Sequence, residues 1–272
     1  MPEIAEVETV RKTLKRQILN KKITNIDVYY DGIILGDVIE FKNILINKEF
    51  TDIKRIGKWL IFELGELALL SHLRMEGKFF LKSVGEEKEK HEHVIFSFED
   101  GSDLRYHDTR KFGKMKVLPL KEVLRSPEIS KQGNEPNSKE LTADYLLDNF
   151  KGKNLAIKTL LLDQTIISGL GNIYANEVLF ASKINPMRKG SSITKKECER
   201  IVNSANEIIK KAIEQGGTTI KSYTSSLGVT GRFQQYLKVH KRENEECLEC
   251  GSLIKNEKVN GRSTYYCPNC QR

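Results

Sequence analysis

The chain has no run of about 18 or more apolar residues, the length that a membrane-spanning helix needs. Its first 25 residues mix acids with bases and contain no apolar segment of the kind found in secretory signals. Internal repeats and low-complexity tracts are also missing. We therefore expect a cytoplasmic protein. Disulfides are rare in that reducing compartment, so the 5 cysteines call for another explanation.

The charge balance is basic, with 45 Lys and Arg residues against 37 Asp and Glu residues. This excess favours a polyanionic partner, most often nucleic acid. A soluble protein that happens to be basic is the alternative, and charge alone does not exclude it. With 272 residues, the chain is long enough for two modest domains.

The beginning of the sequence predicts one helix followed by a set of short strands. Apolar residues recur at spacings of three and four along residues 4–18, which indicates a helix with one apolar face. Residues 22–118 contain strand-like runs separated by charged or glycine-bearing turns. The runs are ITNIDVYY, WLIFEL, LALLSHL, KFFLK, HVIFSF and MKVLPL. They predict an antiparallel sandwich or barrel with the first helix packed beside it.

The remainder of the sequence predicts a linker and then helices, which makes the fold class α+β. Residues 126–140 are polar and contain two prolines and a glycine, as interdomain linkers do. Thr142 is a helix N-cap signal. Residues 154–184 predict two helices separated by a turn at 168–171, and Pro186 is expected to end the second.

A further helix is predicted over residues 193–217, ended by Gly216 and Gly217. The polar, glycine-bearing residues 221–235 follow it. Loops of this length are often functional, so we predict a mobile functional loop there.

Four of the cysteines form two C-x2-C pairs near the end of the chain, with sixteen residues between the pairs. This spacing is typical of a zinc site, because each C-x2-C turn aims two thiolates at one tetrahedral ion. The residues between the pairs predict two strands around a turn at Asn260 and Gly261, the hairpin of a zinc ribbon. Since all four ligands come from the protein, one structural zinc ion is expected. The ligands are Cys247, Cys250, Cys267 and Cys270.

A disulfide framework and a redox pair are poorer explanations, because no secretory signal and no βαβ unit accompany these cysteines. Cys198 is alone on a predicted helix, and we interpret it as an incidental thiol. Arg262 at the tip of the hairpin suits contact with phosphate. Zinc ribbons also bind proteins, so the ribbon alone indicates only a binding module.

The N-terminus has the composition of a reactive amine site. Removal of Met1, which a small second residue permits, would expose the secondary amine of Pro2. A terminal α-amine titrates at about 8, against about 10.4 for lysine, so more of it is neutral at physiological pH. Such an amine can attack a sugar C1′ and form an iminium, with Glu3 and Glu6 nearby as acid/base groups. A helix start with proline in its first turn explains the same residues without any chemistry.

Seven further residues have side chains suited to a DNA interface. A methionine in a predicted hairpin turn can wedge between bases, and an aromatic ring flanked by cations can stack on them. An asparagine at the start of a helix lies beside backbone N–H groups that can bind phosphate. Taken singly, each has a structural explanation: a solvated lysine, a core methionine, a partly buried phenylalanine, a helix turn without a ligand. The residues are Lys58, His72, Met75, Arg110, Lys111, Phe112 and Asn172.

Together these segments resemble the formamidopyrimidine-DNA glycosylases, bacterial base-excision repair enzymes for oxidised purines. The resemblance rests on PEIAEVET, the GK before WLIFEL, SHLRMEGKF, HDTRKFG, GLGNIYANEVLF and GRSTYYCPNCQR, which occur in the family's order. It implies a catalytic β-sandwich domain at 1–125, a linker at 126–140, a helix-two-turn-helix domain at 141–236 and a zinc-ribbon finger at 237–272. The implied partner is double-stranded DNA with oxidised bases, bound by a monomer in the cytoplasm, at the nucleoid.

The resemblance also implies how the reaction proceeds. Pro2 attacks C1′ of the damaged nucleotide, Glu3 assists ring opening and proton transfer, and Glu6 supports that site. β-Elimination and then δ-elimination cut the strand after base release. Lys58 lies near the lesion and its phosphate, and Arg262 grips a flanking phosphate.

DNA contacts follow from the same resemblance. The gap left by the flipped base is filled by Met75, Arg110 and Phe112, with Arg110 pairing with the orphaned cytosine. A loop at about 217–236 closes over the extruded base. The remaining DNA contacts are His72, Lys111, Asn172 and His240.

Two positions depart from the family pattern: Ala5 replaces a usual proline, and His240 replaces a common tyrosine. The nearest alternative is the endonuclease VIII type of glycosylase, which acts on oxidised pyrimidines. PEIAEVET, MEGKF and RKFG favour the purine enzyme over it. A non-catalytic zinc-ribbon DNA-binding protein is the alternative from another class, and it would not need a free Pro2.

Overall fold

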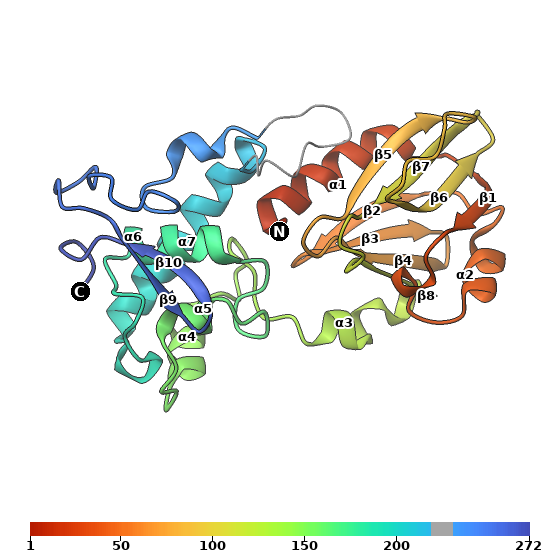
Figure 1. Ribbon diagram of the computed structural model, residues 1–272. Helices are drawn as coiled ribbons and strands as arrows, with labels where there is room; N and C mark the ends of the chain where they lie inside the picture. The colour runs from red at the N-terminus through yellow and green to blue at the C-terminus, as the bar shows by residue number, and fades with distance from the viewer. Residues whose placement is uncertain (219–230) are drawn as a thin grey trace. The chain divides into compact units, whose positions relative to one another are not determined.

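The computed structural model describes residues 1–218 and 231–272, which fall into two compact units (Figure 1). The N-terminal unit contains Met1–Ser130 together with Thr218 and Gly231, and the C-terminal unit contains Lys131–Gly217 and Arg232–Arg272. Most of the predicted mobile loop lies outside the described residues. Within the described ranges, no helix is long and apolar enough to cross a membrane.

The N-terminal unit is built around two four-stranded antiparallel sheets, as the sequence predicts. Their strand orders are β1-β6-β7-β5 and β2-β3-β4-β8. Aromatic rings fill the core: the ring centroid of Phe62 lies 5.7 Å from that of Phe50 and 5.6 Å from that of Phe79. The strands are β1 Ile23–Val28, β2 Asp52–Ile56, β3 Trp59–Leu64, β4 Leu67–His72, β5 Lys78–Ser83, β6 Glu92–Phe98, β7 Ser102–His107 and β8 Lys114–Pro119.

Helix α1 (Ile4–Ile18, red in Figure 1) packs against β2 and β3 of the second sheet. Full burial of one such aliphatic side chain contributes about 1.5–3 kcal/mol, so the helix is firmly held on the sandwich. This fixes the position of the first residues of the chain. The buried face is the predicted stripe Ile4, Val7, Val10, Leu14 and Ile18.

Strands β2 and β7 and helix α2 (Val38–Leu45) of this unit are absent from the predicted set. In β7, Asp103 and Arg105 are buried and form a salt bridge of 3.1 Å. In a sequence, alternating charged residues indicate a solvent-exposed segment. The buried charge pair is therefore the reason why the sequence does not predict β7 as a strand. Short 3-10 helices occupy Asp31–Ile33 and Leu120–Arg125.

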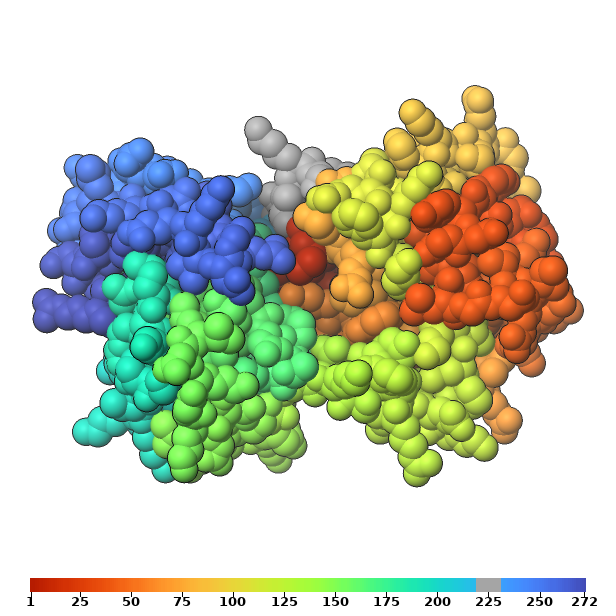
Figure 2. Space-filling view, turned by 60° about the horizontal axis from the view of Figure 1, so that its bottom comes forward, coloured from red at the N-terminus to blue at the C-terminus, as the bar shows by residue number. Residues whose placement is uncertain are grey.

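The predicted linker is partly helical. It begins with helix α3 (Pro127–Ser130). Residues 120–130, lime in Figure 2, cover an apolar cluster of the second sheet that includes Trp59 and Leu70. Because Val123 and Ile129 are buried in that cluster, this part of the segment belongs to the N-terminal unit.

The strand register brings several candidate residues to one end of the sandwich. Trp59 pairs with His72, and His72 pairs with Lys114. Segments 73–77 and 108–113 each cross from one sheet to the other at this end. Our prediction of a hairpin turn at 73–77 is therefore wrong, because β4 pairs with β3 and β8 rather than with the next strand.

The C-terminal unit is helical and ends in a two-stranded ribbon, as predicted. The Thr142 hydroxyl accepts the N–H of Tyr145 at 3.1 Å and caps α4. Helix α6 ends well before Pro186, because Lys183 has a left-handed φ of 61° that stops the helix. The elements are α4 Ala143–Phe150, the short α5 Ile157–Leu161, α6 Asn172–Ala181, α7 Lys195–Glu214, β9 Lys255–Val259 and β10 Arg262–Tyr266, with 3-10 helices at Gly190–Ser192 and Phe233–Tyr236.

Candidate active site and nucleic-acid interface

The carboxylate of Glu6 holds the start of α1 in place. Its Oε2 accepts the N–H of Glu3 at 2.8 Å, and its Oε1 accepts the N–H and the hydroxyl of Thr218 at 2.7 and 2.9 Å. Glu3 and Glu6 are both buried. Because Glu3 is the N-cap, Pro2 precedes the helix, and the interpretation of Pro2 as a first-turn residue is wrong.

A cation and three carboxyl groups act on the amine at the start of the chain. Burial lowers the pKa of the Met1 α-amine below its ordinary value of 8.0. Lys58, which is itself buried, lowers this pKa further, whereas Glu3, Glu6 and Glu76 raise it. A lowered pKa keeps more of an amine neutral, which is the form that attacks carbon.

His72 at the end of β4 offers a neutral ring. The ring lies edge-on to Trp59 at 4.8 Å, and Nδ1 accepts the N–H of Arg74 at 2.9 Å. Burial, with the nearby cations of Arg74 and Lys58, lowers the pKa of His72 to about 3. The ring can therefore donate one hydrogen bond, from Nε2. Met75 is half-buried in the segment that follows.

Segment 108–113 presents cations and an aromatic ring at the same end of the sandwich. The buried Asp108 accepts the N–H of Arg110 at 3.0 Å and thereby shapes the turn. Phe112 is 48% exposed, and the Arg110 guanidinium lies 4.8 Å from its ring centroid. Lys111 has a left-handed φ of 58° and is exposed. A surface ring beside cations suits base stacking rather than core packing.

The two connecting segments are joined to each other. The Thr109 hydroxyl donates to the carboxylate of Glu76. Tyr106 lies between the segments, so close that a Cβ on Gly77 or Gly113 would be 2.2 or 1.6 Å from its hydroxyl oxygen. Both glycines are therefore needed for the close approach, and the two segments form one structure.

In the C-terminal unit, Ser263 links the predicted phosphate-binding turn to the ribbon. Its carbonyl accepts Asn172 Nδ2 at 3.1 Å and Lys158 Nζ at 2.8 Å. Lys158 is fully buried and also donates to the hydroxyl of Thr264 at 2.7 Å. Arg262, one residue before Ser263, is exposed. Asn172 and Arg262 are thus held near each other.

His240 lies before the ribbon and is 6% exposed. Its Nδ1 is 2.8 Å from the side-chain amide of Asn176. The buried carboxylate of Glu177 accepts the N–H groups of residues 238–240 at 2.7, 3.1 and 2.8 Å. Burial is the main cause that lowers the pKa of His240 to about 4. The ring is neutral, and its contact with phosphate stays a prediction.

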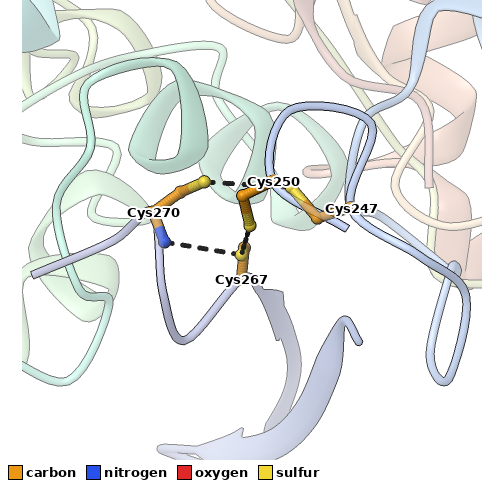
Figure 3. Close-up of side chains that lie close together, drawn as sticks. All are labelled: Cys247, Cys250, Cys267 and Cys270. Atoms are coloured by element: carbon orange, nitrogen blue, oxygen red, sulfur yellow. Dashed lines mark hydrogen bonds between the residues drawn. The ribbon is translucent and has the colours of Figure 1, made fainter. Parts of the chain in front are cut away.

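The four cysteines of the C-x2-C pairs face one another across two turns (Figure 3). All four Sγ atoms lie within 4.8 Å of each other. Across the two C-x2-C pairs, the Sγ of Cys247 lies 3.9 Å from that of Cys270, and the Sγ of Cys250 lies 3.4 Å from that of Cys267. Zinc–thiolate bonds of about 2.3 Å place tetrahedral sulfurs at similar separations, so this donor set fits one Zn²⁺. Cys198 is buried in α7, away from this set.

Comparison with known proteins covers almost the entire chain. Residues 1–115 match the formamidopyrimidine-DNA glycosylase N-terminal domain, residues 132–224 its H2TH domain, and residues 244–272 the zinc finger found in FPG and IleRS. Formamidopyrimidine-DNA glycosylases of Lactobacillus delbrueckii subsp. bulgaricus and of Listeria monocytogenes are each 42% identical, with 100% of both chains covered.

The chain belongs to the formamidopyrimidine-DNA glycosylase family. Its fold agrees with solved structures from Lactococcus lactis. A mutant FPG in complex with a Fapy-dG containing DNA has a TM-score of 0.95 at 38% identity and 100% coverage of both chains. The complex of Fpg with an abasic-site containing DNA has a TM-score of 0.94 at 38% identity and 99% coverage of both chains. The present chain is therefore a DNA glycosylase for oxidised purines, and abasic-site lyase activity is typical of its family. Its ribbon holds one structural zinc ion.

Sequence reasoning missed four residues that position the candidate groups of this glycosylase. None of these residues is indicated by a pattern in the neighbouring sequence, because each one contacts a distant segment or backbone groups. The residues are Asp108, Lys158, Glu177 and Thr218.

Proposed function

We propose that this glycosylase uses the secondary amine of Pro2, exposed by removal of Met1, as its nucleophile. The arrangement of the chain start supports this. Pro2 is buried just before α1, and the amine at this point senses the carboxylates of Glu3 and Glu6 and the ammonium of Lys58. Burial lowers the pKa of the Met1 amine, and the Pro2 amine would lie at the same buried place.

The proposed chemistry has two stages. The Pro2 nitrogen attacks C1′ while the glycosidic bond breaks, and the base leaves with the bonding electrons and takes up a proton. Glu3 is the proposed proton carrier that also opens the sugar ring, and the iminium forms as the amine loses its proton. The iminium acidifies the C2′ hydrogen, and loss of that proton expels the 3′ phosphate. A second elimination expels the 5′ phosphate.

The proposed partner is duplex DNA with an oxidised purine, bound by a monomer. The exposed Phe112 and the adjoining Arg110 support a role in filling the gap left by the flipped base, together with Met75. Lys58 is proposed to hold the lesion's phosphate. The remaining proposed phosphate contacts are His72, Lys111, Asn172, His240 and Arg262.

We also propose the domain division inferred from the sequence, with catalytic residues in 1–125, the helix-two-turn-helix domain in 141–236 and the zinc-ribbon finger in 237–272. The compact units divide after Ser130, inside the proposed linker. The relatives are bacterial and named for action on DNA, which supports work in the cytoplasm at the nucleoid.

Borohydride trapping on a duplex with an 8-oxoguanine:cytosine pair tests the nucleophile. We expect a covalent adduct with the natural chain and none with Pro2→Gly. Pro119→Gly, at an exposed position at the end of β8, is the matched control and should form the adduct. An undiminished adduct with Pro2→Gly would refute the assignment. The mass of the intact protein shows whether Met1 is removed. A comparison of lesions separates the purine enzyme from the endonuclease VIII type, and we expect excision of 8-oxoguanine to exceed that of thymine glycol.

A further inference from the structure

A row of paired cations and rings continues beyond segment 108–113 along the same end of the sandwich. The Lys111 ammonium lies 4.6 Å from the ring centroid of Tyr30, and the Lys88 ammonium lies 4.6 Å from that of Tyr29. Tyr29 is 53% exposed and Tyr30 is 37% exposed. The proposed mechanism uses Lys111 but neither tyrosine nor Lys88.

The two tyrosines are fixed beside the proposed DNA contacts. They directly follow β1, and the next turn is held by Lys114, whose ammonium donates to the carbonyl of Gly32 at 2.5 Å. Lys114 pairs in the sheet with His72. Tyr29 and Tyr30 therefore extend the same end of the sandwich that carries segment 108–113.

The segment between β5 and β6, which carries Lys88, is held in place by a buried cation. The Arg105 guanidinium donates to the carbonyls of Glu86 and Glu87 at 2.8 and 3.3 Å. Arg105 is 2% exposed, and its charge is balanced by Glu92 and Asp103, each at 3.1 Å. This buried network has no role in the proposed chemistry. It orders the segment before any ligand arrives, which lowers the entropy cost of using Lys88 as a contact.

We propose that Tyr29, Tyr30 and Lys88 bind the backbone of duplex DNA beyond the base pairs that segment 108–113 contacts. An ammonium neutralises a phosphate, while a tyrosine ring packs on the adjoining sugar and its hydroxyl can donate to phosphate. Continuity with segment 108–113 favours duplex DNA over an acidic peptide or a stacked single strand. The inference rests on the proposed function, because it extends the same interface.

Salt-dependent binding of a duplex with a tetrahydrofuran abasic analogue tests this surface. The variants are Tyr29→Leu, Lys88→Gln and their combination. Lys48→Gln, an exposed lysine at the opposite end of the sandwich, is the control. Binding is compared on a duplex of roughly 10 base pairs, about one helical turn, and on one about three times longer.

On the long duplex we expect the double variant to bind roughly fivefold to tenfold more weakly, with a salt slope smaller by about 0.9 for each phosphate that the protein no longer neutralises. Lys88→Arg should retain the natural affinity. On the short duplex all variants should bind alike. An unchanged salt slope on the long duplex would overturn the proposal, as would equal weakening on both duplexes. So would weakening that is seen only when the protein binds one of the strands in single-stranded form. On the 8-oxoguanine:cytosine duplex, which unlike the tetrahydrofuran analogue can form an iminium, saturating protein should give the borohydride adduct in every variant, and its absence in the natural chain would instead refute the proposed nucleophile.

Discussion

Thr218 and Glu6 form a two-point contact: the N–H and the hydroxyl of Thr218 both donate to Glu6 Oε1, at 2.7 and 2.9 Å. The other oxygen of the same carboxylate accepts the N–H of Glu3. One buried side chain therefore joins the backbone at residue 218 to the N-cap of α1, beside Pro2. Because the carboxylate is shared, a change at Thr218 should alter the position of Pro2.

Thr218→Val should slow single-turnover excision of 8-oxoguanine by about tenfold. The substitution removes the hydroxyl bond to a charged group, worth about 1.5–3 kcal/mol, and keeps the backbone bond. Affinity for an abasic-analogue duplex should change far less than the rate. Thr24→Val is the control, because its exposed hydroxyl donates only to the carbonyl of Ser97. A natural rate in Thr218→Val would show that the contact does not position the nucleophile.

Acid should destabilise the protein partly through His240. Its folded pKa of about 4 lies below the ordinary value of 6.5, so the unfolded chain binds the proton first as pH falls. This stabilisation is fully present above about pH 6.5 and is lost as pH falls toward 4, by on the order of 3 kcal/mol. Urea unfolding should therefore show a flatter pH dependence in His240→Gln. The depressed pKa of His72 acts in the same direction in both proteins, so the difference isolates His240. Parallel pH profiles would contradict the prediction.

The parts of the fold that could be predicted depend on local signals. The apolar stripe of α1, the cap at Thr142 and the two C-x2-C pairs each lie within a few residues of the structure they produce. Strand β7 could not be predicted, because its charged Arg105 is buried only when Glu92 from the neighbouring strand pairs with it. The hairpin predicted at 73–77 is wrong for a similar reason. One of the two strands that pair with β4 is β8, which comes from much later in the chain.

The candidate site divides in the same way. Pro2 and Glu3 could be proposed from their chemistry and from the resemblance, because they are adjacent in the sequence. Thr218 is 212 residues from Glu6, and Lys158 is 106 residues from Thr264. Only the folded backbone brings such groups together, and a threonine or a lysine alone predicts no partner.

Lys158→Met should weaken the attachment of β10 to the helical part of its unit. The substitution keeps the length of the side chain but leaves the carbonyl of Ser263 and the hydroxyl of Thr264 without this buried donor. Ser263 keeps its hydrogen bond from Asn172, so what is lost is the bonding to a charged donor, worth about 1.5–3 kcal/mol, and hydrogen exchange in β10 should accelerate at least tenfold. DNA affinity should fall while zinc content stays at one ion per chain. Lys210→Met, at an exposed position of α7, is the control. Natural exchange rates in Lys158→Met would show that other contacts hold the strand.

Loss of zinc should weaken DNA binding while the N-terminal unit stays folded. Structural zinc contributes about 10–16 kcal/mol to folding in small zinc domains, so Cys267→Ser or chelation should disorder the ribbon that carries Arg262. The single tryptophan, Trp59, lies in the β-sandwich, and its fluorescence therefore reports the other unit alone. We expect duplex affinity to fall by tenfold or more, on the order of the contribution of Arg262 and Asn172 together, with natural Trp59 emission. Cys198→Ser controls for loss of a thiol. Unchanged affinity would show that the ribbon is not a DNA contact, and altered Trp59 emission would show that the sandwich depends on it.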